Sequence, residues 1–207
     1  MNELKRYQLC AIMKRIIIYG MQNYCSEDGI VFYIDGQILL FIQEHVRNAV
    51  CDVFFKGVTR LGDAGIFWIL LTIVLLCFKQ TRKAGIYSAC GLLASLVINN
   101  LLLKNLIGRI RPYELVEGLR CIVPPAHDAS FPSGHTGASF ASAVSMYRQL
   151  PKKSAVFFIV LASLIAFSRL YVGIHYPTDV LGGLVTGIGI GILVNVIGDK
   201  IDNLKKA

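Results

Sequence analysis

The sequence predicts an all-α, integral-membrane helical bundle of five to six transmembrane helices. Hydrophobic residues make up 55% of the 207 positions and charged residues only 16%, whereas charged residues approach a quarter of a soluble domain. The hydrophobic residues are gathered in long runs, and a helix of about 20 such residues crosses the hydrocarbon core of a bilayer. Several runs of this kind in so short a chain would be hard to keep in water, so we expect membrane spans.

Five apolar runs account for the predicted spans. They are Ala64–Phe78, Ala84–Leu103, His135–Tyr147, Ser154–Phe167 and Asp179–Gly198. The second and fifth runs reach the length of a span outright, and the others do so with their flanking residues. The third run is milder and rich in Ala and Ser. This composition suits a helix that is packed tightly among other helices.

The first sixty residues do not have the pattern of a plain span. Five ionisable side chains interrupt the apolar residues there: Asp35, Glu44, His45, Arg47 and Asp52. We therefore expect residues 1–60 to form an interfacial amphipathic helix or an irregular first span. Residues 61–200 then form the membrane domain, and residues 201–207 form a cytoplasmic tail. The basic residues near the start favour a cytoplasmic N-terminus, which requires a sixth crossing before Ala64; they are Lys5, Arg6, Lys14 and Arg15.

The basic residues also predict the orientation in the membrane. The net charge is +8, and the basic residues lie between apolar runs, which favours anionic lipid over nucleic acid as their partner. Three clusters fall on one side if each run spans once: Lys79, Arg82 and Lys83; Arg148, Lys152 and Lys153; Lys200, Lys205 and Lys206. The positive-inside rule makes that side cytoplasmic. The non-cytoplasmic face of this multi-pass plasma-membrane protein then receives the loop Lys104–Pro132 and the turn Arg169–Pro177.

Three short stretches at the non-cytoplasmic face carry chemically promising side chains. They are KNLIGRIRP (104–112), PSGH (132–135) and SRLYVGIHYPTD (168–179). They supply three permanent cations, a serine, two histidines and a carboxylate, which suits an anion with several oxygens, phosphate first. An arginine fork binds such oxygens in pairs, and a lysine adds a point charge. No cluster of His, Cys and carboxylates has the spacing of a metal site, so no metal is expected.

Two of these stretches are expected at helix N-termini, where free backbone N–H groups and a partial positive charge attract anions. Ser133 and Gly134 lie where a helix should begin, and glycine lets the backbone approach a ligand closely. Pro177 is tolerated in a first helical turn. His175 then precedes this helix and Asp179 lies one turn inside it. The carboxylate can accept the proton of one ring nitrogen and leave the other nitrogen free to attack.

These stretches resemble the type 2 phosphatidic acid phosphatase family, integral-membrane lipid phosphatases that are related to the vanadium haloperoxidases. The family pattern is Lys, six residues, Arg-Pro; then Pro-Ser-Gly-His; then Ser-Arg, five residues, His, three residues, Asp. All its fixed positions match: Lys104, Arg111 and Pro112; Pro132, Ser133, Gly134 and His135; Ser168, Arg169, His175 and Asp179. The resemblance covers roughly residues 61–198. The stretch RLGDAGIFW (60–68) also looks like the lead-in to the first well-formed span of small bacterial members.

The resemblance implies a lipid phosphatase with assigned residues. His175 would attack phosphorus and form a phosphohistidine, while Asp179 would hold and polarise it. His135 would protonate the leaving oxygen and then activate water. The implied phosphate ligands are Lys104, Arg111, Ser133, Gly134 and Arg169. No metal or other cofactor is implied, because the side-chain cations already neutralise the phosphoryl group.

Other functions remain open on the sequence alone. One is an anion or lipid transporter, although the charges gather at one membrane face and no inverted repeat is apparent. Another is a catalytically idle lipid-phosphate binder, although both histidines and Asp179 are present. A haloperoxidase-like use of the pocket is a third, although the spans suit a lipid that is delivered laterally. Arg109 and Arg120 either guide an anionic headgroup or are solvated loop charges.

The identity of the lipid is left open among three candidates. A site that faces away from the cytoplasm would meet undecaprenyl diphosphate, phosphatidylglycerol phosphate or phosphatidic acid in the outer leaflet. The short chain resembles bacterial members of the family, many of which serve the undecaprenyl carrier cycle. The resemblance therefore favours undecaprenyl diphosphate by a small margin.

Overall fold

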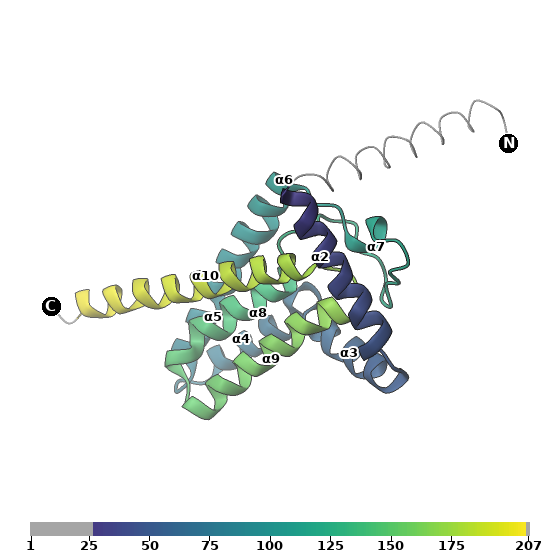
Figure 1. The fold of residues 1–207 in the computed structure, drawn as a ribbon. Helices are drawn as coiled ribbons and strands as arrows, with labels where there is room; N and C mark the ends of the chain where they lie inside the picture. Colours follow the sequence, from purple (N-terminus) through teal and green to yellow (C-terminus); the bar gives the residue numbers. More distant parts are fainter. Residues whose placement is uncertain (1–26, 206–207) are drawn as a thin grey trace, which may run out of the picture. The chain divides into compact units, whose positions relative to one another are not determined.

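The computed structural model describes residues 27–205, so the basic residues of the first 26 positions and Lys206 lie outside the described part of the chain. Within that part, every regular element is a helix (Figure 1). The chain divides into two compact units, Met1–Ile38 and Leu39–Ala207. The described end of the first unit belongs to helix α2 (Glu27–Phe41). The second unit contains all the residues of the three motif stretches.

The elements after α2 follow one another with short connections. They are η1 (Ile42–Val46), α3 (Ala49–Leu61), η2 (Asp63–Gly65), α4 (Ile66–Cys77), α5 (Arg82–Ser95), η3 (Leu96–Leu103), α6 (Lys104–Ile107), α7 (Pro112–Leu115), α8 (Gly134–Met146), η4 (Tyr147–Gln149), α9 (Lys152–Tyr171) and α10 (Pro177–Leu204). The longest connection, residues 116–133, is the loop that leads into the PSGH stretch.

Among the described residues, three helical segments are long and apolar enough to cross a membrane: Arg82–Leu115, Lys152–Tyr171 and Pro177–Leu204. If α3 and the segment Asp63–Cys77 are taken together as one span that is bent by 47°, the pair also meets the length and composition of a span and brings the number to four. The run that begins at His135 forms α8, but this helix has 13 residues, about 20 Å at 1.5 Å per residue. It is shorter than the hydrocarbon core. The predicted count of five to six spans therefore stays a prediction.

Helix α8 lies among α5, α9 and α10 (Figure 1), and most of its side chains are buried. Small residues allow this close packing. A Cβ atom on Gly187 of α10 would lie 2.7 Å from the carbonyl oxygen of Gly137, and one on Gly91 of α5 would lie 2.7 Å from that of Ala141. The expectation that the Ala- and Ser-rich run packs tightly among other helices is confirmed.

Polar contacts between helices accompany this packing. The indole N–H of the buried Trp68 donates to Ser139 Oγ at 2.9 Å. Ser88 Oγ lies 2.6 Å from Thr72 Oγ1 and 2.7 Å from Ser142 Oγ. In a bilayer such bonds satisfy polar groups that lipid cannot, and they fix the helices relative to one another. They therefore hold α8, which carries the PSGH stretch, in a set position against α4 and α5.

The outward faces of the long helices are apolar. Ile73 on α4 is 51% exposed, Leu93 on α5 64% and Val185 on α10 69%. A soluble protein rarely leaves large apolar surfaces of this kind open to water, whereas lipid chains cover them readily. The exposure pattern thus agrees with a membrane-embedded bundle.

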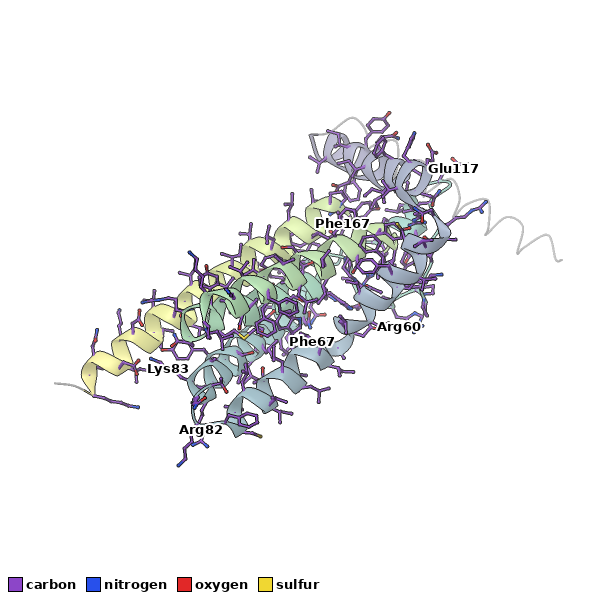
Figure 2. All side chains as sticks on the ribbon, turned by 90° about the horizontal axis from the view of Figure 1, so that it is seen from below. Arg60, Phe67, Arg82, Lys83, Glu117 and Phe167 are labelled. Carbon is purple, nitrogen blue, oxygen red and sulfur yellow. The ribbon has the colours of Figure 1, made fainter. Side chains whose placement is uncertain are left out.

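The helices have two chemically distinct ends. At one end, Lys83 pairs with Asp202 at 2.5 Å and Arg148 pairs with Asp199 at 2.6 Å. These exposed pairs contribute only about 0–1 kcal/mol each, but they show that the basic clusters of three segments share one end, as predicted. Figure 2 shows Lys83 at this end and Glu117 toward the opposite end. The opposite end carries the motif stretches.

Candidate active site

Helix α8 starts where the sequence predicts. Ser133 is its N-cap, and its hydroxyl accepts a bond from the backbone N–H of Thr136. Gly134 is the first helical residue, and a Cβ atom there would lie 2.7 Å from Asn100 Oδ1. The glycine therefore lets α8 approach the helix that leads to Lys104. Its position at a helix N-terminus leaves backbone N–H groups directed out of the helix end.

Helix α10 begins beside this point, also as predicted. Tyr176 is the N-cap, Pro177 is the first helical residue, and Asp179 is the third, whose carboxylate accepts the Tyr176 N–H at 2.9 Å. The backbone N–H of Ser133 donates to the Asp179 carbonyl at 3.0 Å. Two helix N-termini therefore meet at the site, and their partial positive charges add.

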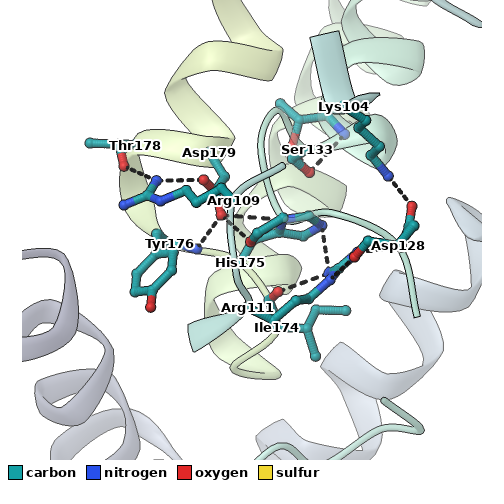
Figure 3. A network of polar contacts seen from close by, with 12 residues as sticks. Lys104, Arg109, Arg111, Asp128, Ser133, Ile174, His175, Tyr176, Thr178 and Asp179 are labelled. Carbon is teal, nitrogen blue, oxygen red and sulfur yellow. Dashed lines mark hydrogen bonds and ion pairs between the residues drawn. The ribbon is translucent and has the colours of Figure 1, made fainter. Parts of the chain in front are cut away.

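His175 and Asp179 form a buried pair, with 1% and 0% of their surfaces exposed. His175 Nδ1 lies 3.5 Å from Asp179 Oδ2, and Ser130 bridges the two by donating to the same carboxylate oxygen. The other ring nitrogen, Nε2, faces the guanidinium of Arg111 at 3.3 Å (Figure 3). Burial lowers the pKa of His175 to about 3, so its ring is neutral at physiological pH. A neutral ring with Nε2 directed at a cationic site has the geometry of a nucleophile for a bound anion.

Arg109 completes the surroundings of the carboxylate. Its guanidinium donates to Asp179 Oδ1 at 2.5 Å and to Thr178 Oγ1 at 2.6 Å, and it lies 4.1 Å from the centre of the Tyr176 ring. The sequence suggests that Arg109 either guides an anionic headgroup or is a solvated loop charge. Neither interpretation predicts its ion pair with Asp179. Because Arg109 and Ser130 both donate to Asp179, the carboxylate is held in one orientation.

Lys104 and Arg111 are brought together by a carboxylate that the sequence does not reveal. Asp128, on the loop before α8, accepts from Arg111 Nη2 at 2.6 Å through one oxygen and from Lys104 Nζ through the other. Although burial opposes it, hydrogen bonding and charge from these two cations lower the pKa of Asp128 to about 2. Arg111 is further fixed by the carbonyls of Asp128 and Ile174, each at 2.9 Å. Lys104 and Arg111, two predicted phosphate ligands, therefore both bind the carboxylate of Asp128.

Arg169 is buried near the end of α9, with 4% of its surface exposed. Its Nη1 donates to the hydroxyl of Thr59 on α3. Its Nε is also buried and has no hydrogen-bond partner within the described chain. A buried guanidinium with a free donor is costly unless an anion binds to it, which agrees with its predicted role as a phosphate ligand.

Residues before position 61 also support the site. Arg47, which precedes α3, donates to the carbonyl of Tyr171 at 2.8 Å and to that of Arg120 at 2.6 Å. Tyr171 in turn donates to Asp52 at 2.7 Å. Between Tyr171 and His175 the chain turns through Gly173, whose φ of +79° favours glycine. The segment that lacks a clean span pattern thus holds the turn that carries His175.

A cavity of about 500 Å³ lies beside the PSGH stretch, within the size range of small-molecule sites. Its apolar wall comes from α4, α5 and η3 and includes Ile69, Leu92, Leu93 and Leu96. Its polar lining includes Asn100, Lys104, Asp128 and His135. His175 does not line it, but Asp128 connects the cavity to Arg111 and His175 (Figure 3). A molecule with a hydrocarbon part and an anionic end fits this division.

The structure groups most of the predicted site residues. Arg111, Ser133, His175 and Asp179 share one network, and Lys104 joins it through Asp128 (Figure 3). His135 and Gly134 line the cavity, and Arg169 lies at the end of α9. Sequence reasoning missed Asp128 and Ser130. The only sequence signal for them is their position just before the PSGH stretch.

A buried His–Asp pair beside several cations, carried on membrane helices with an adjoining apolar cavity, defines a class of enzyme that handles phosphate esters at the bilayer. A sequence model of the PAP2 superfamily matches residues 84–202, and the chain belongs to this superfamily. The chain is 35% identical over 126 residues to an undecaprenyl-diphosphatase of Sulfolobus acidocaldarius, a match that spans 61% of each chain. It is 37% identical over 148 residues to undecaprenyl-diphosphatase BcrC of Bacillus subtilis, covering 71% of this chain and 75% of that one.

The fold agrees with this membership. The crystal structure of the first transmembrane PAP2 type phosphatidylglycerolphosphate phosphatase from Bacillus subtilis superposes with a TM-score of 0.71. The two chains are 24% identical, and the superposition covers 94% of this chain and 98% of that one. Family and relatives together make the chain a membrane lipid phosphatase.

Proposed function

We propose that the chain hydrolyses a lipid diphosphate, undecaprenyl diphosphate, to the lipid monophosphate and phosphate. The observation that carries the proposal is the cavity, which joins an apolar wall to the cationic residue Lys104 and to His135. Relatives of 35% and 37% identity are named undecaprenyl-diphosphatases, and one of 32% identity is named phosphatidylglycerophosphatase B. The higher identities support undecaprenyl diphosphate as the first candidate.

The proposed first step is attack of His175 Nε2 on the terminal phosphorus. The bond from phosphorus to the bridging oxygen breaks as the bond to nitrogen forms, and His135 gives its proton to the departing oxygen. Asp179 balances the positive charge on the ring. Phosphate oxygens take the place of the Asp128 carboxylate on Lys104 and Arg111, and Arg169 and the N-terminus of α8, with Ser133 and Gly134, bind the remaining oxygens.

In the proposed second step, water attacks the phosphohistidine. His135, now neutral, takes a proton from the water, so the nitrogen–phosphorus bond breaks and phosphate leaves. His175 is returned to its neutral form and His135 to its protonated form, which balances protons over the cycle. The step uses the same two histidines as the first, in reverse order.

The test is a panel of three lipids assayed under equal detergent conditions: undecaprenyl diphosphate, phosphatidylglycerol phosphate and phosphatidic acid. We expect kcat/KM for undecaprenyl diphosphate to exceed that for the other two by roughly 10-fold or more, within the discrimination that a pocket supplies. A clear preference for either monophosphate would contradict the proposed substrate. Release of no phosphate from any of them would contradict the phosphatase itself.

The same assays are run with and without EDTA. Within residues 27–205 no three His, Cys, Asp or Glu side chains form a cluster that could hold a metal ion, while Lys104, Arg111 and Arg169 supply positive charge. Turnover is therefore expected to be unchanged by EDTA. Loss of most turnover on chelation, with recovery on adding Mg²⁺, would show that the proposed charge neutralisation is incomplete.

We also propose that the site faces the non-cytoplasmic side, because the basic clusters share the opposite end of the bundle. Two single cysteines, introduced in a chain whose native cysteines are replaced by serine, test this orientation. Glu117→Cys lies on the exposed loop at the site end, and Arg82→Cys lies at the basic end (Figure 2). In intact cells a membrane-impermeant maleimide is expected to label Glu117→Cys and to spare Arg82→Cys. The reverse pattern would invert the proposed topology.

A further inference from the structure

We propose that Asp63 is a positioning residue for His135, whose ring it orients for proton transfer to the leaving oxygen. The inference rests on the proposed function, because it assigns a partner to the proposed general acid. Asp63 Oδ1 lies 2.9 Å from His135 Nε2. The residue is outside the three motif stretches, in the turn η2 between α3 and α4.

The charges around His135 give this contact its importance. Burial is the main cause that lowers the pKa of His135, to about 4, and the positive charges of Arg169 on α9 and Lys104 on α6 act in the same direction. Asp63 on η2 is the carboxylate that opposes them. Without it, the ring would be surrounded by positive charge and would lose its proton more readily. A general acid that must begin each cycle protonated needs this compensation.

Each of the two histidines thus has a carboxylate partner, and the two pairs differ in how far they are exposed to solvent. The His175–Asp179 pair is buried, whereas 56% of the Asp63 side chain and 18% of the His135 side chain are exposed. Burial suits a nucleophile that must stay neutral. Partial exposure suits an acid–base group that exchanges protons with water in each turnover. The side chains of the His135–Asp63 pair are therefore more accessible to water than those of the His175–Asp179 pair, although burial lowers the pKa of both histidines.

The backbone around Asp63 is shaped to make this contact. A Cβ atom on Gly62 would lie 2.4 Å from Cδ2 of the His135 ring, so glycine is required for the close approach. Ala64 has a φ of +50° and Gly65 one of +68°, a left-handed turn that is unusual for alanine. This turn lies at the 47° bend between α3 and α4. Backbone strain of this kind persists where surrounding contacts hold it, often at functional sites.

A purely structural role for Asp63 would be to cap α4. The cap of that helix is Gly65, and no side-chain hydrogen bond caps it. The side-chain hydrogen bond that the structure shows for Asp63 goes to His135. The carboxylate is thus directed at the ring, and a test can separate the two roles by the pH dependence of the rate.

The test compares Asp63→Asn with the unsubstituted protein on two esters. With a lipid diphosphate, kcat/KM is expected to fall by about 10- to 100-fold, less than the whole contribution of a general acid. With p-nitrophenyl phosphate, whose leaving group needs little protonation, single-turnover release of p-nitrophenolate is expected to fall by less than about 3-fold. The alkaline limb of the lipid pH–rate profile is expected to shift to lower pH, because a neutral amide no longer favours the protonated ring.

Two further variants complete the test. Asp63→Glu keeps the carboxylate and is expected to recover part of the lipid rate and the position of the alkaline limb. Asp199→Asn removes an exposed carboxylate that pairs with Arg148 at the other end of the bundle, and it is expected to leave both reactions unchanged.

The outcomes are distinguishable. Equal losses of Asp63→Asn on both esters, with an unshifted alkaline limb, would overturn the positioning role and leave a structural one. Full activity of Asp63→Asn would overturn it as well. If the unsubstituted protein hydrolyses no lipid phosphate, the proposed function is wrong, and this is known before any Asp63 variant is compared.

Discussion

His175→Ala is expected to abolish turnover, with kcat falling by about 10⁴-fold or more, the scale on which loss of a nucleophile acts. Phosphoenzyme formation should disappear with it, because none of the described groups around the ring is placed to replace it. Ser130 donates to Asp179, and Ser133 caps α8. The Arg111 side chain offers hydrogen-bond donors and no acceptor, so it cannot attack.

The measurement is acid-quench trapping of phosphoenzyme from a substrate labelled in its terminal phosphate. His127→Ala is the matched control, because His127 is an exposed histidine of the 116–133 loop that matches no motif position. It should form phosphoenzyme at the rate of the unsubstituted chain. Labelled phosphoenzyme that persists in His175→Ala would show that another residue is the nucleophile.

His135→Ala is expected to produce the second largest loss, and its size should depend on the leaving group. A lipid phosphate needs a proton as it departs, so removal of the general acid should slow the first step by about 10²- to 10⁴-fold. p-Nitrophenolate departs as a stable anion, so the first step with its phosphate ester should fall by roughly 10-fold or less. The second step should be impaired for both esters, because His135 also activates water.

Single-turnover release of the leaving group, measured for both esters, separates these steps. Phosphoenzyme should accumulate in His135→Ala with the p-nitrophenyl ester, since it forms readily and is hydrolysed slowly. The loss in Asp63→Asn should be smaller than in His135→Ala on the same lipid, because the asparagine variant keeps the ring. Equal losses for His135→Ala on both esters would show that the ring is not the general acid.

The amino-acid sequence was enough to predict the class of fold and where the motif residues lie along the chain. Long apolar runs predict membrane helices because lipid leaves the backbone no partner outside a helix. Helix starts at Gly134 and Pro177 follow from local rules for serine caps and first-turn proline, and the structure confirms both. His175 and Asp179 are four residues apart at such a helix start, so local geometry also predicts that their side chains lie close together.

The distant side chains that complete the site are identified by the packing of the helices and loops. Asp128 is 17 residues from Arg111, Ser130 is 49 from Asp179, and Thr59 is 110 from Arg169. Local propensity does not predict such pairs, because they depend on how helices pack and how one loop folds back. The length of α8 and its place among α5, α9 and α10 are likewise consequences of packing.

The turn at Asp63 shows the same division between local and tertiary causes. Its irregular backbone has a local cause, since Gly62 and Gly65 flank Asp63 and Ala64 in this turn. That Asp63 contacts His135, 72 residues away, depends on the packing of this turn against the start of α8. Asp63 can be the partner of His135 only when the two lie within hydrogen-bond distance. That distance depends on how the helices between them pack.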